Sequence, residues 1–184
     1  KTAYEISLGL VGSEMCIRDS PFEGDVPIEQ LGRIAQHYSE LGFKGIGLGD
    51  TTGMATPPIV RRAVKYLQDT LPELPIGLHF HNTRGLGLVN VMAGLDEGID
   101  QFDASFGGIG GCPFAPKATG NICTEDLVYL LHEMNIDTGI DLQALMTIAT
   151  QVETVVGHNL PGQVMKAGPR LDLHSMTSVA TAQG

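Results

Sequence analysis

Positive charge is scarce in this sequence. Eleven lysines and arginines stand against 21 aspartates and glutamates, which gives a formal net charge of −10 at pH 7. Nucleic-acid-binding proteins use clustered basic residues to neutralise phosphates, so this composition argues against that function. The chain also lacks an apolar run near the ~20 residues that a membrane-spanning helix requires, and no basic start leads into an apolar signal segment. We therefore expect neither nucleic acid nor a membrane among its partners.

Cysteine is also rare, with three residues in 184. An odd and small number of cysteines does not fit a secreted disulfide scaffold, so we expect a reduced, cytoplasmic compartment. A mitochondrial location would require a targeting peptide upstream of this sequence. Glycine, by contrast, is abundant: 24 glycines and 10 prolines indicate many tight connections between short elements rather than a helix bundle. The apolar content of 42% is sufficient for a sizeable core.

The first twenty residues differ from the rest of the chain. Residues 2–8 have the character of a strand, but residues 9–20 (GLVGSEMCIRDS) show neither helical nor alternating periodicity. This stretch resembles the translation of a sequencing adapter, so we interpret residues 1–20 as a non-native segment and give Cys16 no role. Residues 21–156 are then expected to form the folded domain, and residues 157–184 a C-terminal tail.

From residue 21 onward, helical and strand patterns alternate. Apolar spacing predicts helices at about 25–41, 57–71 and 88–95, a fourth from 124 and a fifth from 141 to 155. Short apolar runs at 45–50, 75–80 and 100–106 are typical of buried strands. This alternation predicts an α/β fold with a parallel sheet. Periodicity does not distinguish a TIM barrel from a doubly wound sheet, and three strands are fewer than the eight of a complete barrel.

Two histidines mark the end of the second predicted strand. Residues two apart on a strand point to the same side, so His79 and His81 are placed to present two imidazoles to one point. Such a pair suits a divalent metal ion. The alternative is that both rings are hydrogen-bonded to neighbours and bind nothing.

A glycine-rich loop, residues 107–120, follows the third predicted strand. Catalytic loops of α/β folds occupy this end of the strands. Cys112 lies at its tip between glycine and proline, where a thiol is able to exchange a proton or attack a carbonyl; a small buried apolar side chain is an equal alternative. Cys123, near a helix start, is expected to pack in the core.

Polar residues near the same strand ends have either a structural role or a role in the site. Asn121 is either a turn residue or an amide-oxygen ligand for a metal. Asp50 precedes Thr51 at the end of the first strand. It is either a turn carboxylate or a group that faces the same end of the sheet as the two histidines. Asp103 lies in the third strand and is expected to be a hydrogen-bond partner of a site residue.

Four segments together resemble hydroxymethylglutaryl-CoA lyase, a family of the metal-dependent TIM-barrel lyases, aldolases and acyl-CoA-condensing synthases. They read LGDTTGMATP (48–57), HFHNTRGLGLVN (79–90), GGIGGCPFAPKATGN (107–121) and TEDLVYLLHEMNIDTG (124–139). The resemblance implies a partial TIM barrel that comprises the last three strands with their helices and further C-terminal helices. It also implies cleavage of 3-hydroxy-3-methylglutaryl-CoA to acetoacetate and acetyl-CoA, as in leucine degradation and ketone-body formation.

The resemblance also implies roles for individual residues. His79, His81 and Asn121 match metal ligands, with Mg²⁺ or Mn²⁺ as the cofactor, and Cys112 matches the catalytic cysteine. His79 is also placed to relay a proton. Asp50, Thr51 and Asp103 are expected to contact substrate or to support the ligands. The partner implied is an acyl-CoA substrate, and the full-length enzyme is expected to be a homo-oligomer.

The sequence departs from the family at one point. The family's first barrel strand carries an aspartate ligand and an arginine, and no such segment occurs here. We therefore expect the isolated chain to be an inactive fragment. The alternatives are a related acyl-CoA-condensing synthase, a hydroxy-oxo-acid aldolase, or a non-catalytic fragment that packs against a partner.

Overall fold

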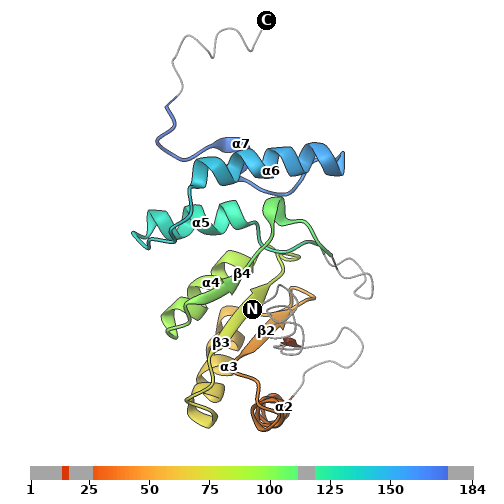
Figure 1. The fold of residues 1–184 in the computed structure, drawn as a ribbon, viewed down its shortest axis with the longest axis vertical. Helices are drawn as coiled ribbons and strands as arrows, with labels where there is room; N and C mark the ends of the chain where they lie inside the picture. Colours follow the sequence, from red (N-terminus) through yellow and green to blue (C-terminus); the bar gives the residue numbers. More distant parts are fainter. Residues whose placement is uncertain (1–13, 17–26, 112–118, 174–184) are drawn as a thin grey trace, which may run out of the picture.

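A parallel sheet forms the centre of the computed structural model, which describes residues 14–16, 27–111 and 119–173 (Figure 1). The strand order is β1-β2-β3-β4, and all neighbouring strands are parallel. Parallel neighbours need a crossover connection, and a helix supplies each one. The strands are β1 (Glu14–Cys16), β2 (Ile46–Asp50), β3 (Ile76–Phe80) and β4 (Gln101–Asp103), and the intervening helices are α2 (Ile28–Glu40), α3 (Pro57–Thr70) and α4 (Gly87–Asp96). The predicted α/β class is confirmed.

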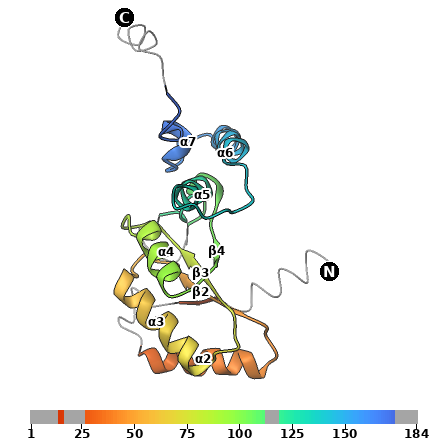
Figure 2. The ribbon, with the colours of Figure 1, turned by 90° about the vertical axis from the view of Figure 1, so that its left-hand side faces the viewer.

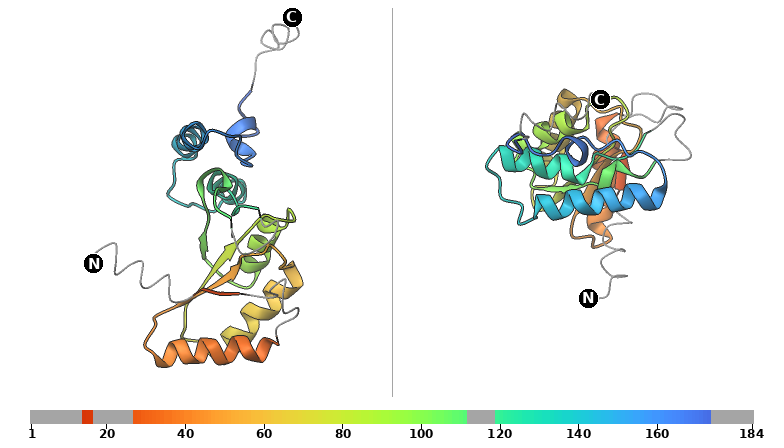
Figure 3. Two further views of the ribbon diagram at one scale, coloured as in Figure 1. Left: turned by 90° about the vertical axis from the view of Figure 1, so that its right-hand side faces the viewer. Right: turned by 90° about the horizontal axis from the view of Figure 1, so that it is seen from above.

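Helices α2, α3 and α4 cover one face of this sheet (Figures 2 and 3). Side chains three or four residues apart share one side of a helix, and α3 buries Val60, Val64 and Leu67 in this way. They pack in one core with Leu48 of β2 and Phe80 of β3, both fully buried. The helices form where the apolar spacing predicts them because this spacing is what lets one side pack on the sheet.

The other face of the sheet has a different character. Side chains alternate along a strand. The other face therefore carries the side chain of His79 and the glycine positions 47 and 77, and no described helix lies on it (Figures 2 and 3). A sheet covered by helices on one side only, with small and polar residues on the other, has the organisation of a segment of a barrel wall.

Three further helices continue past the β4 edge of the sheet (Figure 1). A short 3₁₀ turn, η1 (Phe106–Gly108), leads from β4 into the glycine-rich loop, and α5 (Thr124–Glu133), α6 (Leu142–Val156) and α7 (Val164–Ala167) follow. The carboxylate of Asp126 on α5 accepts the N–H groups of Gln163 and Val164, at 3.0 and 2.7 Å. It therefore caps α7 and fixes this last helix to α5.

The structure differs from the sequence expectation in three places. Strand β1 lies inside residues 1–20; its three residues pair with β2 through the backbone, which needs no side-chain periodicity. The third predicted strand, 100–106, is shorter because Ser105 bonds to the segment around Ile122 and Phe106 begins η1. The region after residue 157, expected as a tail, contains α7 and the buried Leu160. Whether residues 1–20 are non-native stays a prediction.

In the described part of the chain, every helix is too short or too polar to cross a lipid bilayer.

Candidate active site

The two predicted histidines meet at the carboxyl end of β3. His79 lies in the strand, in register with Gly49 of β2 and Asp103 of β4, and His81 follows one residue after the strand ends. Their ring centroids are 5.2 Å apart, with the rings inclined at 66°. The expectation that both imidazoles point to one side of the strand is confirmed.

Each histidine uses its Nδ1 atom to bond to a neighbouring oxygen. Nδ1 of His79 pairs with the carboxylate of Asp103, and Nδ1 of His81 lies 2.9 Å from the carbonyl oxygen of Thr119. A carbonyl or carboxylate oxygen only accepts, so the proton of each neutral ring is on Nδ1 and the lone pair is on Nε2. Histidines that bind metals in proteins are commonly oriented in this way. Asp103 is the last residue of β4 and is exposed, yet it provides the hydrogen bond that the sequence predicted.

Asn121 reaches the same place through a segment that runs between the ends of β3 and β4. The amide of Ile122 donates to the carbonyl of Phe80 at 3.0 Å, and Asn121 pairs with His81 in an antiparallel bridge. The side-chain Nδ2 of Asn121 donates to the carbonyl of Ile109 at 3.0 Å. Its Oδ1 is buried and has no hydrogen-bond partner among the described residues.

This donor set fits a divalent cation. The His79 and His81 rings lie side by side and Asn121 pairs with His81, and a buried amide oxygen without a hydrogen bond is costly unless a cation or another donor satisfies it. In the described ranges, however, no group of three or more His, Cys, Asp or Glu side chains is arranged to hold a metal ion. The described residues are therefore compatible with part of a metal site.

Asp50 supports the loop that follows β2 at the same edge. Its Oδ1 accepts the amide N–H of Met54 at 2.8 Å, while its Oδ2 is buried without a hydrogen-bond partner in the described structure. Arg84, in the loop after β3, donates from Nη1 to the carbonyls of Thr52 and Gly53, each at 3.0 Å. Asp50 is therefore a turn carboxylate at this end of the sheet, where the half-buried Thr51 follows it.

The burial of Asp50 predicts a specific dependence of stability on pH. Burial raises the pKa of Asp50 to about 6, against the lowering effects of the Ala55 and Met54 amides and the nearby charges of Arg84 and His79. The folded state therefore binds this proton more tightly than the unfolded chain, whose pKa is 3.8. The contribution of Asp50 to stability is full below about pH 4 and falls as the pH rises to about 6, by about 3 kcal/mol in total.

Urea unfolding between pH 4 and 7 measures this effect. The chain should lose free energy of unfolding over that interval, and Asp50→Asn, which is neutral at every pH, should lose correspondingly less. Identical pH slopes for the two proteins would contradict the assignment to Asp50.

The two cysteine expectations have different outcomes. Cys112 lies outside the described residues, and its catalytic role stays a prediction. Cys123 is 4% exposed, which confirms that it packs in the core; burial, with the nearby carboxylates of Asp126 and Glu125, raises the pKa of its thiol. It is therefore a protonated packing residue.

Sequence reasoning missed the groups that orient the site. The carbonyl oxygens of Thr119 and Ile109 hold His81 and Asn121, and any residue type offers a carbonyl, so no sequence signal marks them. The bonds from Arg84 to the neighbouring loop were also missed. An arginine next to a predicted site was the available signal there.

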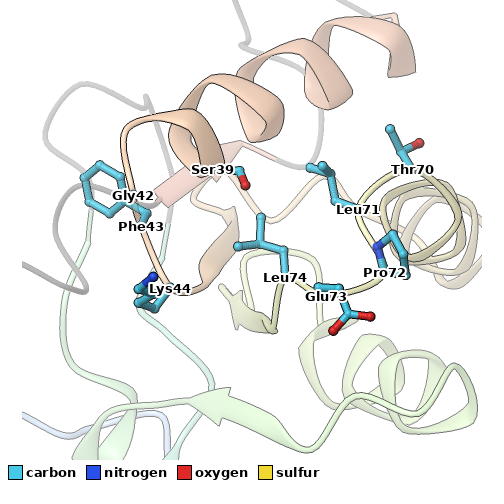
Figure 4. A pocket seen from close by; sticks show the side chains of 9 residues that line it. All are labelled: Ser39, Gly42, Phe43, Lys44, Thr70, Leu71, Pro72, Glu73 and Leu74. Carbon is cyan, nitrogen blue, oxygen red and sulfur yellow. The ribbon is translucent and has the colours of Figure 1, made fainter.

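The structure also has a pocket of about 360 Å³ beside the amino ends of the strands, at the other end of the sheet from the histidines (Figure 4). The end of α2 and the loop to β2 provide part of its lining, and the end of α3 and the loop to β3 provide the rest: Ser39, residues 42–44 and residues 70–74. Phe43 and Leu74 contribute apolar surface, and Lys44 and Glu73 contribute opposite charges (Figure 4). The pocket lies at the amino ends of β2 and β3, so it is separate from the histidines at the carboxyl ends.

The fold and the site together define a class: α/β-barrel chains that gather a His-x-His pair and an asparagine at the carboxyl edge of a parallel sheet. The HMGL-like family model matches residues 14–152. The chain belongs to the HMGL-like family, a family of metal-dependent lyases.

Curated and solved relatives agree with this assignment. The chain is 46% identical to (R)-citramalyl-CoA lyase of Chloroflexus aurantiacus, covering 81% of this chain and 47% of that protein. It is 44% identical to a hydroxymethylglutaryl-CoA lyase of Bacillus subtilis, covering 78% and 48%. The structure of an HMG-CoA lyase from A. baumannii, in complex with coenzyme A and 3-methylmalate, superposes with a TM-score of 0.80 at 50% identity, covering 85% and 51%. The partial TIM barrel is thereby confirmed, and the chain spans about half the length of the relatives it matches.

Proposed function

We propose that this chain supplies one half of the barrel of a metal-dependent lyase that cleaves 3-hydroxy-3-methylglutaryl-CoA to acetoacetate and acetyl-CoA. The observation that carries the proposal is the convergence of His79, His81 and Asn121 at one edge of the sheet, with both Nδ1 atoms bonded to acceptors and the Asn121 Oδ1 buried without a partner in the described structure. Relatives that carry this activity by name support it.

His79, His81 and Asn121 would hold the cation, and their nitrogen and oxygen donors suit Mg²⁺ or Mn²⁺ completed by oxygen ligands. When bound, such a cation supplies Lewis acidity, which lowers the pKa of a coordinated hydroxyl group. Asp103 and Thr119 accept the Nδ1 protons of the two rings, which places the lone pair of each ring on Nε2.

The same geometry limits what His79 does in a single step. Its Nδ1 is committed to Asp103, so Nε2 is the one nitrogen with a lone pair. One lone pair does not bind a cation and accept a proton at the same time, so proton relay by His79 would alternate with ligation. Asp50 and Arg84 hold the loop that carries Thr51 at the same end of the sheet.

Cys112 is proposed to protonate the enolate of acetyl-CoA that the cleavage releases.

The charged ligand and the arginine of the family are proposed to come from residues outside these 184. A test combines the purified chain with the N-terminal half of the Bacillus subtilis relative, and this pair is the assembled enzyme. Acetoacetate and acetyl-CoA are measured with Mg²⁺ and 3-hydroxy-3-methylglutaryl-CoA. We expect no turnover and weak metal binding for the chain alone, and turnover for the assembled enzyme.

The outcomes separate the two parts of the proposal. Turnover by the purified chain alone would show that its own residues complete the site. A stable, metal-loaded assembled enzyme that released no acetyl-CoA would contradict the lyase assignment. The cytoplasmic location and the homo-oligomer stay predictions beside these.

A second acyl-CoA substrate has specific support. The relative from Chloroflexus aurantiacus is named for (R)-citramalyl-CoA, and it is 46% identical to this chain. The two substrates share a CoA thioester and a tertiary alcohol, so the same site chemistry would serve both. Comparing acetyl-CoA release from each, as kcat/KM in the assembled enzyme, decides between them.

A further inference from the structure

A buried carboxyl group that the proposed reaction does not use lies in α5, four residues after Asn121. Glu125, in the first turn of α5, is 0% exposed. Its Oε2 accepts the amide N–H of Gly107 at 3.0 Å, while its Oε1 is buried with no hydrogen-bond partner in the described structure. Burial raises the pKa of this carboxyl group, and the neighbouring Asp126 raises it further. A residue this costly to bury needs a reason beyond a favourable position in the helix dipole.

The two glycines of the turn that Glu125 contacts are tightly packed. A Cβ built at Gly107 would lie 2.4 Å from Leu160 Cδ1, and one at Gly108 would lie 2.7 Å from Cys123 Sγ. From the opposite side, a Cβ at Gly162 would lie 2.3 Å from Glu125 Oε1. The turn therefore packs against both α5 and the segment 160–162, and the Glu125 carboxyl group contacts the turn on one side and Gly162 on the other.

The far end of the same turn holds a proposed metal ligand. The carbonyl oxygen of Ile109 accepts the Nδ2 of Asn121 at 3.0 Å. A Cβ at Gly110 would lie 2.8 Å from that same nitrogen. The position of the turn thus sets the orientation of the Asn121 carboxamide, because its Nδ2 bond decides where Oδ1 points.

We propose that Glu125 is a positioning residue for this site: it holds the η1 turn through Gly107, so that Ile109 fixes the Asn121 carboxamide with Oδ1 toward the cation. The chain of bonds runs from the Glu125 carboxylate to the Gly107 amide, along two peptide units to Ile109, and across to Asn121. The consequence for metal binding rests on the proposed function; the effect on the turn does not.

The first experiment measures the turn in the chain alone. Amide hydrogen exchange of the peptide 105–111 is followed by mass spectrometry in the parent, Glu125→Ala and Glu125→Gln. Alanine removes the acceptor of a buried amide, so we expect exchange of this peptide to rise about tenfold or more. Glutamine keeps an acceptor oxygen in the same place and should stay within about threefold of the parent.

Two controls separate positioning from a general loss of stability. Glu133→Gln changes a carboxyl group on the same helix that lies at the surface, paired with Arg170, and should leave the 105–111 peptide unchanged. Peptides from β2 and β3 should exchange as in the parent in all variants. If Glu125→Ala does not fold, Gly162→Ala displaces the carboxyl group from its other side and should accelerate the same peptide.

The second experiment follows the metal ligand in the assembled enzyme. Mn²⁺ affinity, measured by titration with electron paramagnetic resonance, should fall about tenfold in Glu125→Ala and return in Glu125→Gln, with KM for the acyl-CoA little changed. A folded Glu125→Ala chain with parental exchange at 105–111 would overturn the proposal, as would equal acceleration of all peptides. Normal exchange effects in an enzyme that lacks lyase activity would contradict the proposed function alone.

Discussion

Replacing His81 by alanine is expected to remove nearly all turnover from the assembled enzyme. His81 is 6% exposed, and its Nδ1 is held by the Thr119 carbonyl, so its Nε2 lone pair is kept in one orientation. Loss of a ligand costs more than loss of the groups that orient it, which is typically 10–100-fold. We expect turnover and Mn²⁺ affinity to fall at least about a hundredfold together.

The matched control is another histidine with a similar hydrogen bond. His132 lies on α5 and bonds through Nε2 to the hydroxyl of Thr138 at 2.9 Å, away from the site. His132→Ala should retain turnover and Mn²⁺ affinity within about twofold, as is usual for a substitution away from reacting groups. Near-parental turnover in a folded His81→Ala enzyme would remove this residue from the site, and with it the proposed ligand set.

A single methyl group at Gly120 is expected to disrupt the site as severely. A Cβ at this position would lie 1.8 Å from the carbonyl oxygen of Gly108 and 3.0 Å from that of Gly110. Both neighbours are backbone, so neither moves away as a flexible side chain would. Either the turn or the segment that carries Asn121 must shift by roughly an ångström or more to restore van der Waals separation.

A displacement at Gly120 would move both the asparagine and a histidine of the proposed ligand set. The Gly120 carbonyl accepts the Asn82 amide at 3.1 Å, and the next residue pairs with His81. We expect Gly120→Ala to lower the free energy of unfolding by about 1–3 kcal/mol, as overpacking commonly does. In the assembled enzyme we expect at least about a hundredfold loss of turnover, since a misplacement near an ångström is sufficient for such losses.

Gly77 provides the comparison for that substitution. It lies in β3, and a Cβ there would contact only ordinary neighbours, the nearest being Gln101 Cβ at 3.8 Å. Urea unfolding of the isolated chain should therefore show Gly77→Ala close to the parent and Gly120→Ala clearly weaker. If both variants unfold with the parental midpoint, segments 107–110 and 119–121 do not approach as closely as described.

The secondary structure followed from local information. The apolar residues of α3 recur every three or four positions, and β3 lies in a short apolar run, so each pattern identifies its own element without reference to the rest of the chain. The same alternation put His79 and His81 on one side of β3, because orientation along a strand is a local property. The motifs of four segments were sufficient to identify the family.

The arrangement around those histidines depended on contacts between distant residues. Asn121 was as readily a turn residue in the sequence; it faces the histidines because segment 120–124 bonds to the ends of both β3 and β4. Glu125 lies in the first turn of α5, where an acidic residue is common at the surface, but the fold buries it and bonds it to Gly107. Backbone hydrogen bonds between remote segments are available to every residue type, so a sequence does not mark them; only the folded chain decides which carbonyl meets which side chain.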